Sequence, residues 1–390
     1  MGIGISLEAV APAHLSIESL HRLAERNLPL EGPLAELFSI KRNQAELTCT
    51  LLPLEEPVFL ELQGGRLIVS AKTSSLGPGY HAALIDGLDR MASAGNFQWI
   101  ETEEALDESG YFGERDFANL QEKFAGYFDG LCRYLVDELA GGAIGGIGIG
   151  LPAGLTPKCG SFAATILGPR SLDFFKSPDP ARHFPWWDQG LTSRVRETLA
   201  HSLAWLVFPW RSPLSGEERL AGEVMAKLAP MASWLEELRR ILGARHAVEP
   251  APNGIGYLRG NIRRCVAGGW GLTVPGYFRQ ELEDDGGTIS FSGLDRFVRV
   301  STFSLERKAP YDPESTLKSA TTKIVLRKGS MALLGEEKPF EDQGFTGRLL
   351  SVQAEAAPGI AVVSIVFPSI AERDWARAVM ESIAAPCSLH

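Results

Sequence analysis

The segment from Lys72 to His81 collects side chains that could bind or react with a small molecule. It lies between an apolar run, residues 66–71, that predicts a strand, and a helical pattern that begins directly after it. A helix N-terminus attracts anions because its free N–H groups and its dipole point toward the ligand. We therefore predict a candidate anion or ligand loop formed by Lys72, Ser74, Ser75 and His81. An ordinary serine-rich helix cap is the alternative.

Aromatic side chains and prolines gather farther along the chain. Tryptophan dominates many protein interfaces because it buries a large area at a low cost in conformational entropy. The neighbouring prolines place part of this cluster in connections between elements. We predict a partner-binding surface formed by Phe184, Trp186, Trp187 and Trp210. The alternative is that these side chains close the core of a helix pair.

A glycine-rich run, residues 141–154, contains the formal spacing of a dinucleotide-binding loop at residues 148–153. Such a loop must follow a strand and open a helix, so that the N–H groups meet the pyrophosphate. Here the run follows a helical pattern, and Pro152 interrupts any continuation. The pattern therefore favours a strand between two turns.

Imidazole and carboxylate side chains recur in and just before the first predicted helix, at the spacing of possible zinc ligands: His14, which precedes the helix, and Glu18, His21 and Glu25. Arg22 offers Glu18 an ordinary ion pair, and one helix cannot surround a tetrahedral ion, so a solvated polar face is favoured. The sequence contains no GxSxG, HExxH, Walker A, CxxC or kinase motif. We predict no metal, no cofactor and no catalytic residue set.

The composition of the 390 residues is that of a globular protein. A formal net charge of −10, from 38 basic and 48 acidic residues, disfavours nucleic acid as a partner. Five widely spaced cysteines predict reduced thiols and a cytoplasmic location. The N-terminus lacks a signal peptide, and no apolar run approaches the roughly 20 residues that a membrane span needs, so no membrane association is expected.

Apolar periodicity predicts the elements of the first half of the chain. A helix is expected over residues 16–26, and another over residues 117–139. Gly64-Gly65 between the apolar runs 58–62 and 66–71 predicts a tight hairpin, because its turn needs positive φ. The acidic residues 101–116 predict a solvated loop.

Residues 188–242 predict an antiparallel helix pair, because the connection between the two apolar periodicities is short. The second helix is expected to start with a capping box, Ser215 and Glu218, and to kink at Pro230. Residues 243–256 read as a linker, since proline, glycine and alanine replace periodic apolar residues there.

Beyond the linker, alternating β-branched patterns predict successive strands, followed by a last helix that starts at a second capping box, Ser369 and Glu372. The predicted class is α+β: an N-terminal α+β region with an αα-hairpin, then a C-terminal antiparallel-sheet α/β sandwich. The expected domains are residues 1–142, 143–248 (a set that could belong to the first domain) and 257–390.

The last part of the chain, about 125 residues, resembles the α/β sandwich of the Mog, PsbP and DcrB-type proteins. The resemblance is carried by the strand and Pro-Gly-aromatic turn at residues 269–278, the strand Ile289-Ser290-Phe291, and the closing strand–proline–helix unit at residues 362–383. Members of these families mostly bind other proteins. The resemblance therefore implies a binding role and supplies no catalytic residues.

These observations predict a non-catalytic protein-binding or accessory protein, such as a bacterial chaperone, immunity or secretion-accessory factor. The alternative is a hydrolase or transferase that acts on an anionic small molecule at the 72–81 loop. The sequence leaves open the identity of the partner, the oligomeric state, and whether residues 1–250 form one domain or two.

Overall fold

The chain forms two compact units in a computed structural model. Unit 1 comprises residues 1–153, 157–246 and 253–258, and unit 2 comprises residues 154–156, 247–252 and 259–390. The structure describes residues 2–386 except 141–146, 153, 154, 156, 158–161, 245, 247, 252, 284, 306–310, 320–323, 343 and 358. Part of the glycine-rich run 141–154 therefore lies outside the described residues.

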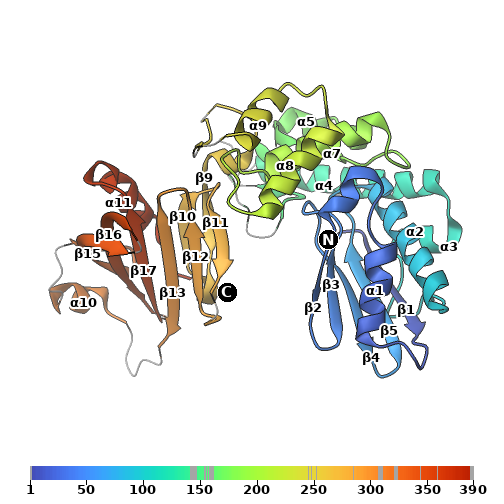
Figure 1. The fold of residues 1–390 in the computed structure, drawn as a ribbon, viewed down its shortest axis with the longest axis horizontal. Helices are drawn as coiled ribbons and strands as arrows, with labels where there is room; N and C mark the ends of the chain where they lie inside the picture. The colour runs from blue at the N-terminus through green and yellow to red at the C-terminus, as the bar shows by residue number, and fades with distance from the viewer. Residues whose placement is uncertain are drawn as a thin grey trace. The chain divides into compact units, whose positions relative to one another are not determined.

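Unit 1 contains a five-stranded antiparallel sheet with the order β1-β5-β4-β3-β2 (Figure 1). Its strands are β1 (Gly4–Val10), β2 (Ser39–Arg42), β3 (Glu46–Thr50), β4 (Val58–Gln63) and β5 (Arg66–Lys72). Alternate side chains such as Leu7, Leu60 and Val69 are buried, because one face of the sheet packs on the core. Helix α1 (Ile17–Asn27) packs against β2 and β3, and α2 (Pro78–Gly95) packs beside α1.

The predicted hairpin is confirmed. Gln63 pairs with Arg66, and Gly64 and Gly65 have φ angles of 59° and 79°. Two successive positive φ angles give a turn whose twist matches that of the flanking strands.

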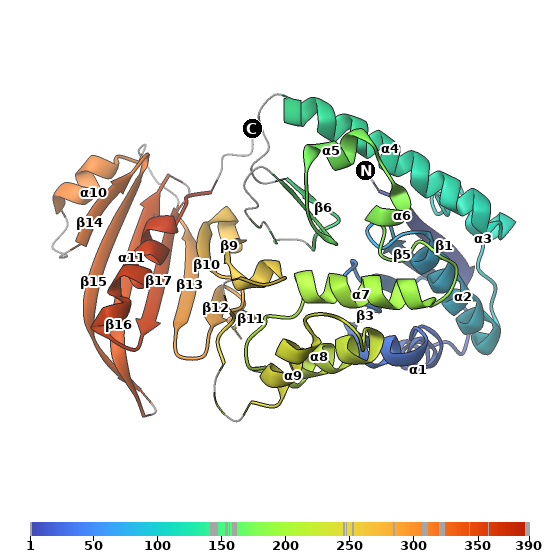
Figure 2. The same cartoon turned by 90° about the horizontal axis from the view of Figure 1, so that it is seen from above.

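A helical layer and a small sheet complete unit 1 (Figure 2). The helices are η1 (Gly32–Leu37), α3 (Tyr111–Glu114), α4 (Phe117–Ala140), α5 (Leu172–Lys176), α6 (Pro180–His183), α7 (Ser193–Leu206), α8 (Gly216–Leu228), α9 (Leu235–Leu242) and, in part, η2 (Tyr257–Arg259). The small sheet consists of β6 (Gly148–Ile149), β7 (Ala163–Thr165) and β8 (Gly168–Arg170). Helices α7 and α8 pack together as the predicted pair, whereas the chain around Pro230 leaves the helix and starts a separate one, so the predicted kink is a break.

The connection between α7 and α8 is locked by buried side chains. Trp210 has a φ angle of 56°, uncommon for a residue with a side chain, and its indole N–H donates to Ala204 O at 2.8 Å. The next residue, Arg211, is fully buried and makes a two-pronged ion pair with Glu218, at 2.6 and 2.8 Å. The Glu218 carboxylate thus binds Arg211 instead of the Ser215 N–H, so only half of the predicted capping box forms. In that half, the Ser215 hydroxyl accepts a hydrogen bond from the Glu218 N–H.

Unit 2 is built on a seven-stranded antiparallel sheet with the order β11-β12-β13-β17-β16-β15-β14. The strands of unit 2 are β9 (Asn261–Cys265), β10 (Gly271–Pro275), β11 (Arg279–Leu282), β12 (Thr288–Ser292), β13 (Phe297–Ser304), β14 (Ile324–Lys328), β15 (Met331–Asp342), β16 (Phe345–Ala356) and β17 (Gly359–Phe367). Its helices are η3 (Ala267–Gly269), α10 (Pro313–Ser319), η4 (Ile370–Glu372) and α11 (Arg373–Ser382). Strands β9 and β10 form a separate pair.

The two faces of the large sheet differ. Helix α11 packs against β10 and β17, and Val300, Ile365 and Leu350 on this side belong to the main core. Helix α10 packs on β14 and β15, where Thr316 bonds to Glu355, a residue that alternates with core residues and so lies on the opposite face. Ser369 makes no side-chain cap, so the predicted capping box of the last helix is wrong.

The predicted α+β class, with a C-terminal antiparallel sheet, is confirmed. Residues 143–246, where described, lie in unit 1 except for Leu155, so most of the second predicted domain joins the first. Helix α8 packs against η1, and α4 packs against α2, α5 and α6, so these helices belong with the N-terminal region.

Replacing Glu218 by Gln should lower the free energy of unfolding by about 3–5 kcal/mol, because it leaves the buried Arg211 charge without its carboxylate. Guanidinium denaturation followed by tryptophan fluorescence measures the effect in unit 1. Replacement of the exposed Glu217 by Gln is the matched control and should change stability by less than about 0.5 kcal/mol. Equal losses in the two variants would contradict the prediction.

Candidate functional site

The 72–81 loop is closed by a carboxylate of its own chain. Glu55 Oε2 accepts hydrogen bonds from the N–H groups of Ser75, at 2.9 Å, and Leu76, at 3.1 Å. These donors lie just before α2, where an anionic ligand was predicted to bind. The position expected for an anion is therefore filled by Glu55.

Burial raises the pKa of Glu55, and its hydrogen bonds with Ser75 and Leu76 only partly oppose this effect. The carboxylate is thus held in a place that favours its neutral form. The segment between β3 and β4 brings it there, and no spacing in the sequence links it to the 72–81 loop.

Lys72 forms an ion pair with Glu56, the residue next to Glu55. Its ammonium group lies 2.9 Å from the Glu56 carboxylate and lines an open depression of about 650 Å³, together with Glu104 and Glu108. Burial alone would lower the pKa of Lys72, but its bond to Glu56 and the charge of Glu55 raise it, so the amine stays protonated. Acidic side chains outnumber this one base, which disfavours an anionic ligand.

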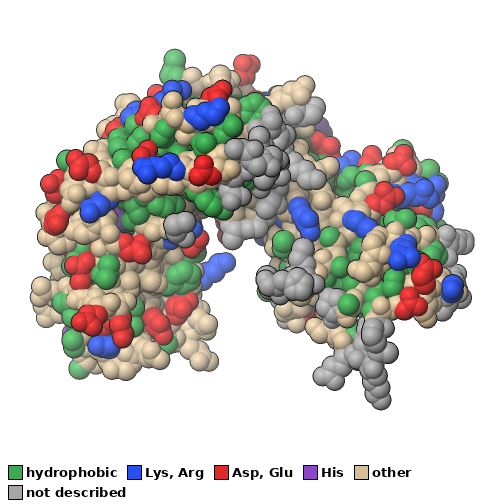
Figure 3. All heavy atoms as spheres, turned by 180° about the vertical axis from the view of Figure 1, so that it is seen from behind, with side chains coloured by type: hydrophobic (Ala, Val, Ile, Leu, Met, Phe, Trp, Pro, Cys, Tyr) green, Lys and Arg blue, Asp and Glu red, His purple; other side chains and the backbone are tan. Residues whose placement is uncertain are grey.

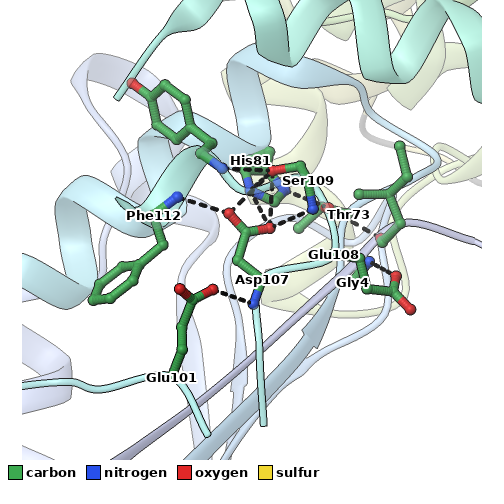
Figure 4. Close-up of polar contacts among 10 residues, drawn as sticks. Gly4, Thr73, His81, Glu101, Asp107, Glu108, Ser109 and Phe112 are labelled. Atoms are coloured by element: carbon green, nitrogen blue, oxygen red, sulfur yellow. Dashed lines mark hydrogen bonds and ion pairs between the residues drawn. The ribbon is translucent and has the colours of Figure 1, made fainter. Parts of the chain in front are cut away.

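His81 lies in the interior, with 0% of its surface exposed, in a closed polar network (Figure 4). Its Nδ1 is 2.9 Å from the Thr73 hydroxyl, and its Nε2 is 3.1 Å from the Ser109 hydroxyl. The Asp107 carboxylate lies 3.2 Å from the same Nε2. The network joins β5, α2 and the segment that runs beside β1, where Asp107 bridges to Ile5.

The Asp107 carboxylate is fully supplied with donors. It accepts from the hydroxyl and N–H groups of Ser109 and from the N–H of Phe112, at 2.7 to 3.0 Å. Burial alone would raise the pKa of Asp107, but the His81 hydrogen bond and charge, together with these N–H groups, hold it below its usual value. Asp107 therefore stays ionised in the folded protein.

Serine, histidine and aspartate meet here without forming a catalytic triad. In a triad the nucleophile and the orienting carboxylate bind different ring nitrogens, whereas Ser109 and Asp107 both face Nε2 of His81. Thr73, on the other nitrogen, is fully buried and also contacts Ile3 O. All four side chains are buried, so the network links these segments inside unit 1.

The predicted partner-binding surface is corrected by burial. Phe184, Trp186 and Trp210 are 1%, 2% and 0% exposed, so they offer no area to another molecule. Trp187 is half-buried and stacks near Phe184, with ring centroids 6.0 Å apart. The alternative that these aromatic side chains close the core is the one that the structure supports.

The aromatic cluster in fact covers the 72–81 loop. The Gly79 N–H donates to Trp186 O, and the Trp186 N–H donates to Leu76 O, both at 2.9 Å. A Cβ atom on residue 79 would lie 2.1 Å from the Trp186 ring, so only glycine fits there. Gly77 likewise lies against Phe184. Two stretches predicted as separate sites are therefore one packed junction.

Sequence reasoning missed the partners that close this junction. Asp107 and Ser109 lie in the acidic stretch 101–116 predicted as a solvated loop, yet both are 3% exposed. An aspartate two residues before a serine and three before a glycine is the signal of a tight side-chain-bonded turn, and it could have been read. Glu55 carried no comparable signal.

Unit 2 carries an open groove of about 770 Å³ on the sheet face opposite α11. Its floor is a cross-strand ladder in which Phe297 pairs with Val366 and Val366 pairs with Leu349. The turn at residues 292–296 lines it, as does the β15–β16 hairpin end. The lining is Glu283, Ser292, Gly293, Leu294, Asp295, Arg296, Phe297, Arg299, Phe340, Asp342, Phe345, Leu349, Ser364 and Val366.

The groove mixes apolar floor and charged rim. Arg299 forms an ion pair with Glu283, and Arg296 forms one with Glu372 at 3.0 Å. Asp342 is exposed and makes no ion pair with any described residue. On the face drawn in Figure 3, unit 2 likewise shows acidic, basic and apolar side chains close together instead of one sign of charge.

Within the described parts of the chain, no group of three or more His, Cys, Asp or Glu side chains is arranged to hold a metal ion. Among the same residues, no helix combines the length and the apolar character needed to cross a bilayer.

No family model matches the sequence, and no curated protein matches it. Three chains of known structure are similar in part. One is a crystal structure of a protein from Bacteroides thetaiotaomicron, with 16% sequence identity and a TM-score of 0.27. The match covers 31% of this chain and about half, 47%, of that one.

Replacing Asp107 by Asn should lower the free energy of unfolding of unit 1 by about 1–3 kcal/mol at pH 7, because the amide leaves one acceptor oxygen instead of two for the buried donors of Ser109 and Phe112. Since the folded-state pKa of Asp107 is lowered, its contribution is present above about pH 4 and disappears as the pH falls through the lowered value. Denaturation curves between pH 3 and pH 8 test both points. Asp129→Asn, at an exposed ion pair, is the control and should show neither effect.

Replacing Glu55 by Gln should have the opposite pH dependence. The folded-state pKa of Glu55 is raised, so the wild type loses stability relative to this variant as the pH rises from about 4 through the raised value. The amide oxygen can still accept from Ser75 and Leu76. Thermal unfolding of both proteins at pH 4 and pH 7 measures the change, and a stability difference that is the same at the two pH values would refute it.

Proposed function

We propose that this protein is a non-catalytic protein-binding or accessory protein, and that the groove of unit 2 holds its partner. The observation that carries the proposal is an apolar floor left open on one face of an antiparallel sheet. Phe297 and Leu349 are only half-buried there, although their neighbours on the other face are packed under α11. A groove with an apolar centre and a polar rim has the composition of a recognition site.

The state of the 72–81 loop favours binding over catalysis. The donors of Ser75 and Leu76 already hold Glu55, and His81 is enclosed with its partners. A hydrolase or transferase acting at this loop would need Lys72 and His81 to face one accessible space, and they face the surface and the interior respectively.

The protein would act as a chaperone, an immunity factor or a secretion-accessory factor, because each of these binds another protein. The resemblance of unit 2 to the Mog, PsbP and DcrB-type proteins supports this role, because their members mostly bind proteins. A cytoplasmic location is proposed from the wide spacing of the five cysteines.

Display of random twelve-residue peptides against the full chain tests the binding role. The wild type should enrich a set of related peptides, and a Phe340→Ser/Phe345→Ser variant should lose at least about tenfold in affinity for them, because two apolar contacts are removed. Fluorescence anisotropy with the selected peptides measures the affinities.

The matched control is Phe303→Ser. Phe303 is 55% exposed on the same face of the sheet but does not line the groove, so its loss should leave peptide binding unchanged. Circular dichroism verifies that both variants are folded. The absence of any enriched peptide, or peptides that bind both variants equally well, would overturn the proposal.

A further inference from the structure

We infer that the groove of unit 2 recognises a short extended segment of another protein that carries a basic side chain near an apolar one. The inference rests on the proposed function and names the chemistry of the partner.

Both arginines that line the groove already form ion pairs within the protein. Arg299 pairs with Glu283, and Arg296 pairs with Glu372 while its cation also lies 5.2 Å from the centre of the Trp375 ring. An acidic ligand would have to break one of these contacts before it could form its own. The groove therefore offers no ready site for a carboxylate or a phosphate.

Two of the negative charges that line the groove are not neutralised by a close ion pair with any described residue. The lining contains three acids, Glu283, Asp295 and Asp342, and two arginines. Lys338, which the register places opposite Leu349 on the same face, does not line the groove; with it, three acids stand against three bases. Asp295 has only a 3.9 Å contact with Arg296, so Asp342 and Asp295 remain able to attract a cation.

Asp342 has aromatic neighbours suited to a cationic side chain. It is paired in register with Phe345, and Phe340 lies two residues before it, so all three point to the same face of the hairpin. The centroids of the two rings are 6.3 Å apart and the rings are tilted by 56°. A carboxylate beside ring faces binds the ammonium or guanidinium group of lysine or arginine while the rings contact its alkyl chain.

The apolar floor of the groove lies farther along β16 from Phe345. Leu349 follows Phe345 by four residues on β16, about 13 Å for an extended chain, and the Phe345 ring packs against Gly347 between them. A ligand segment in extended conformation places side chains of one face two or four positions apart at matching intervals. The basic residue over Asp342 is thus expected two to four positions from an apolar residue over Leu349.

The test uses the peptides selected on the full wild-type chain, together with synthetic versions in which the basic residue is replaced by Asp. The wild type should bind the basic peptide roughly threefold to tenfold more tightly than the acidic version. Asp342→Asn should remove most of this preference, and Asp342→Lys should reverse it. A reversal of preference cannot arise from loss of folding, and it is measured by anisotropy at low and at high salt.

Selected peptides that share no basic residue, or a preference for the basic peptide that is unchanged in Asp342→Lys, would overturn the inference. The proposed function would remain if Phe340→Ser/Phe345→Ser still abolishes peptide binding. Failure of that double variant to affect any peptide would remove both. Sedimentation equilibrium addresses a second copy of the chain as occupant: a dimer that the double variant dissociates would place the protein's own surface in the groove and overturn the inference.

Discussion

The contact between the His81 ring and the Asp107 carboxylate is the centre of a buried polar network that joins three segments of unit 1. A buried pair of this kind is tolerated only when every donor and acceptor around it is satisfied. Thr73, Ser109 and the Phe112 N–H meet that condition. The consequence is that β5, α2 and the segment beside β1 are held in one arrangement, and the residues best suited to chemistry are enclosed.

The same network accounts for the burial of the aromatic cluster. With the start of α2 fixed, Gly77 and Gly79 present bare backbone to the segment that contains Phe184 and Trp186. These side chains fill that surface, and Glu55 occupies the remaining N–H donors from the other side. A loop whose composition suggests a ligand site is thereby converted into a packed junction of the core.

The two faces of the large sheet in unit 2 differ: one is packed against the core, and the other is partly exposed. The face under α11 holds the core, whose members lie between Val266 and Ile383 in the sequence. The opposite face is covered by α10 at β14 and β15, and the region near the β15–β16 hairpin end keeps a groove. A protein that uses one face of a sheet for folding and leaves part of the other open can present a binding surface without weakening its core.

Local patterns in the sequence predict the elements that have strong apolar periodicity or turn chemistry. The helix at residues 17–27, the Gly64-Gly65 hairpin, helix α4 and the α7–α8 pair all follow from local patterns, because apolar spacing and positive-φ glycines act within a few residues. The α+β class follows from the same patterns. The burial and the surroundings of the candidate site residues depend on contacts between distant parts of the chain. Burial of Trp186 depends on Gly79, more than 100 residues away, and the environment of His81 depends on Asp107. The groove depends on the register of β13, β17 and β16, since only pairing across strands brings Phe297, Val366 and Leu349 into one floor.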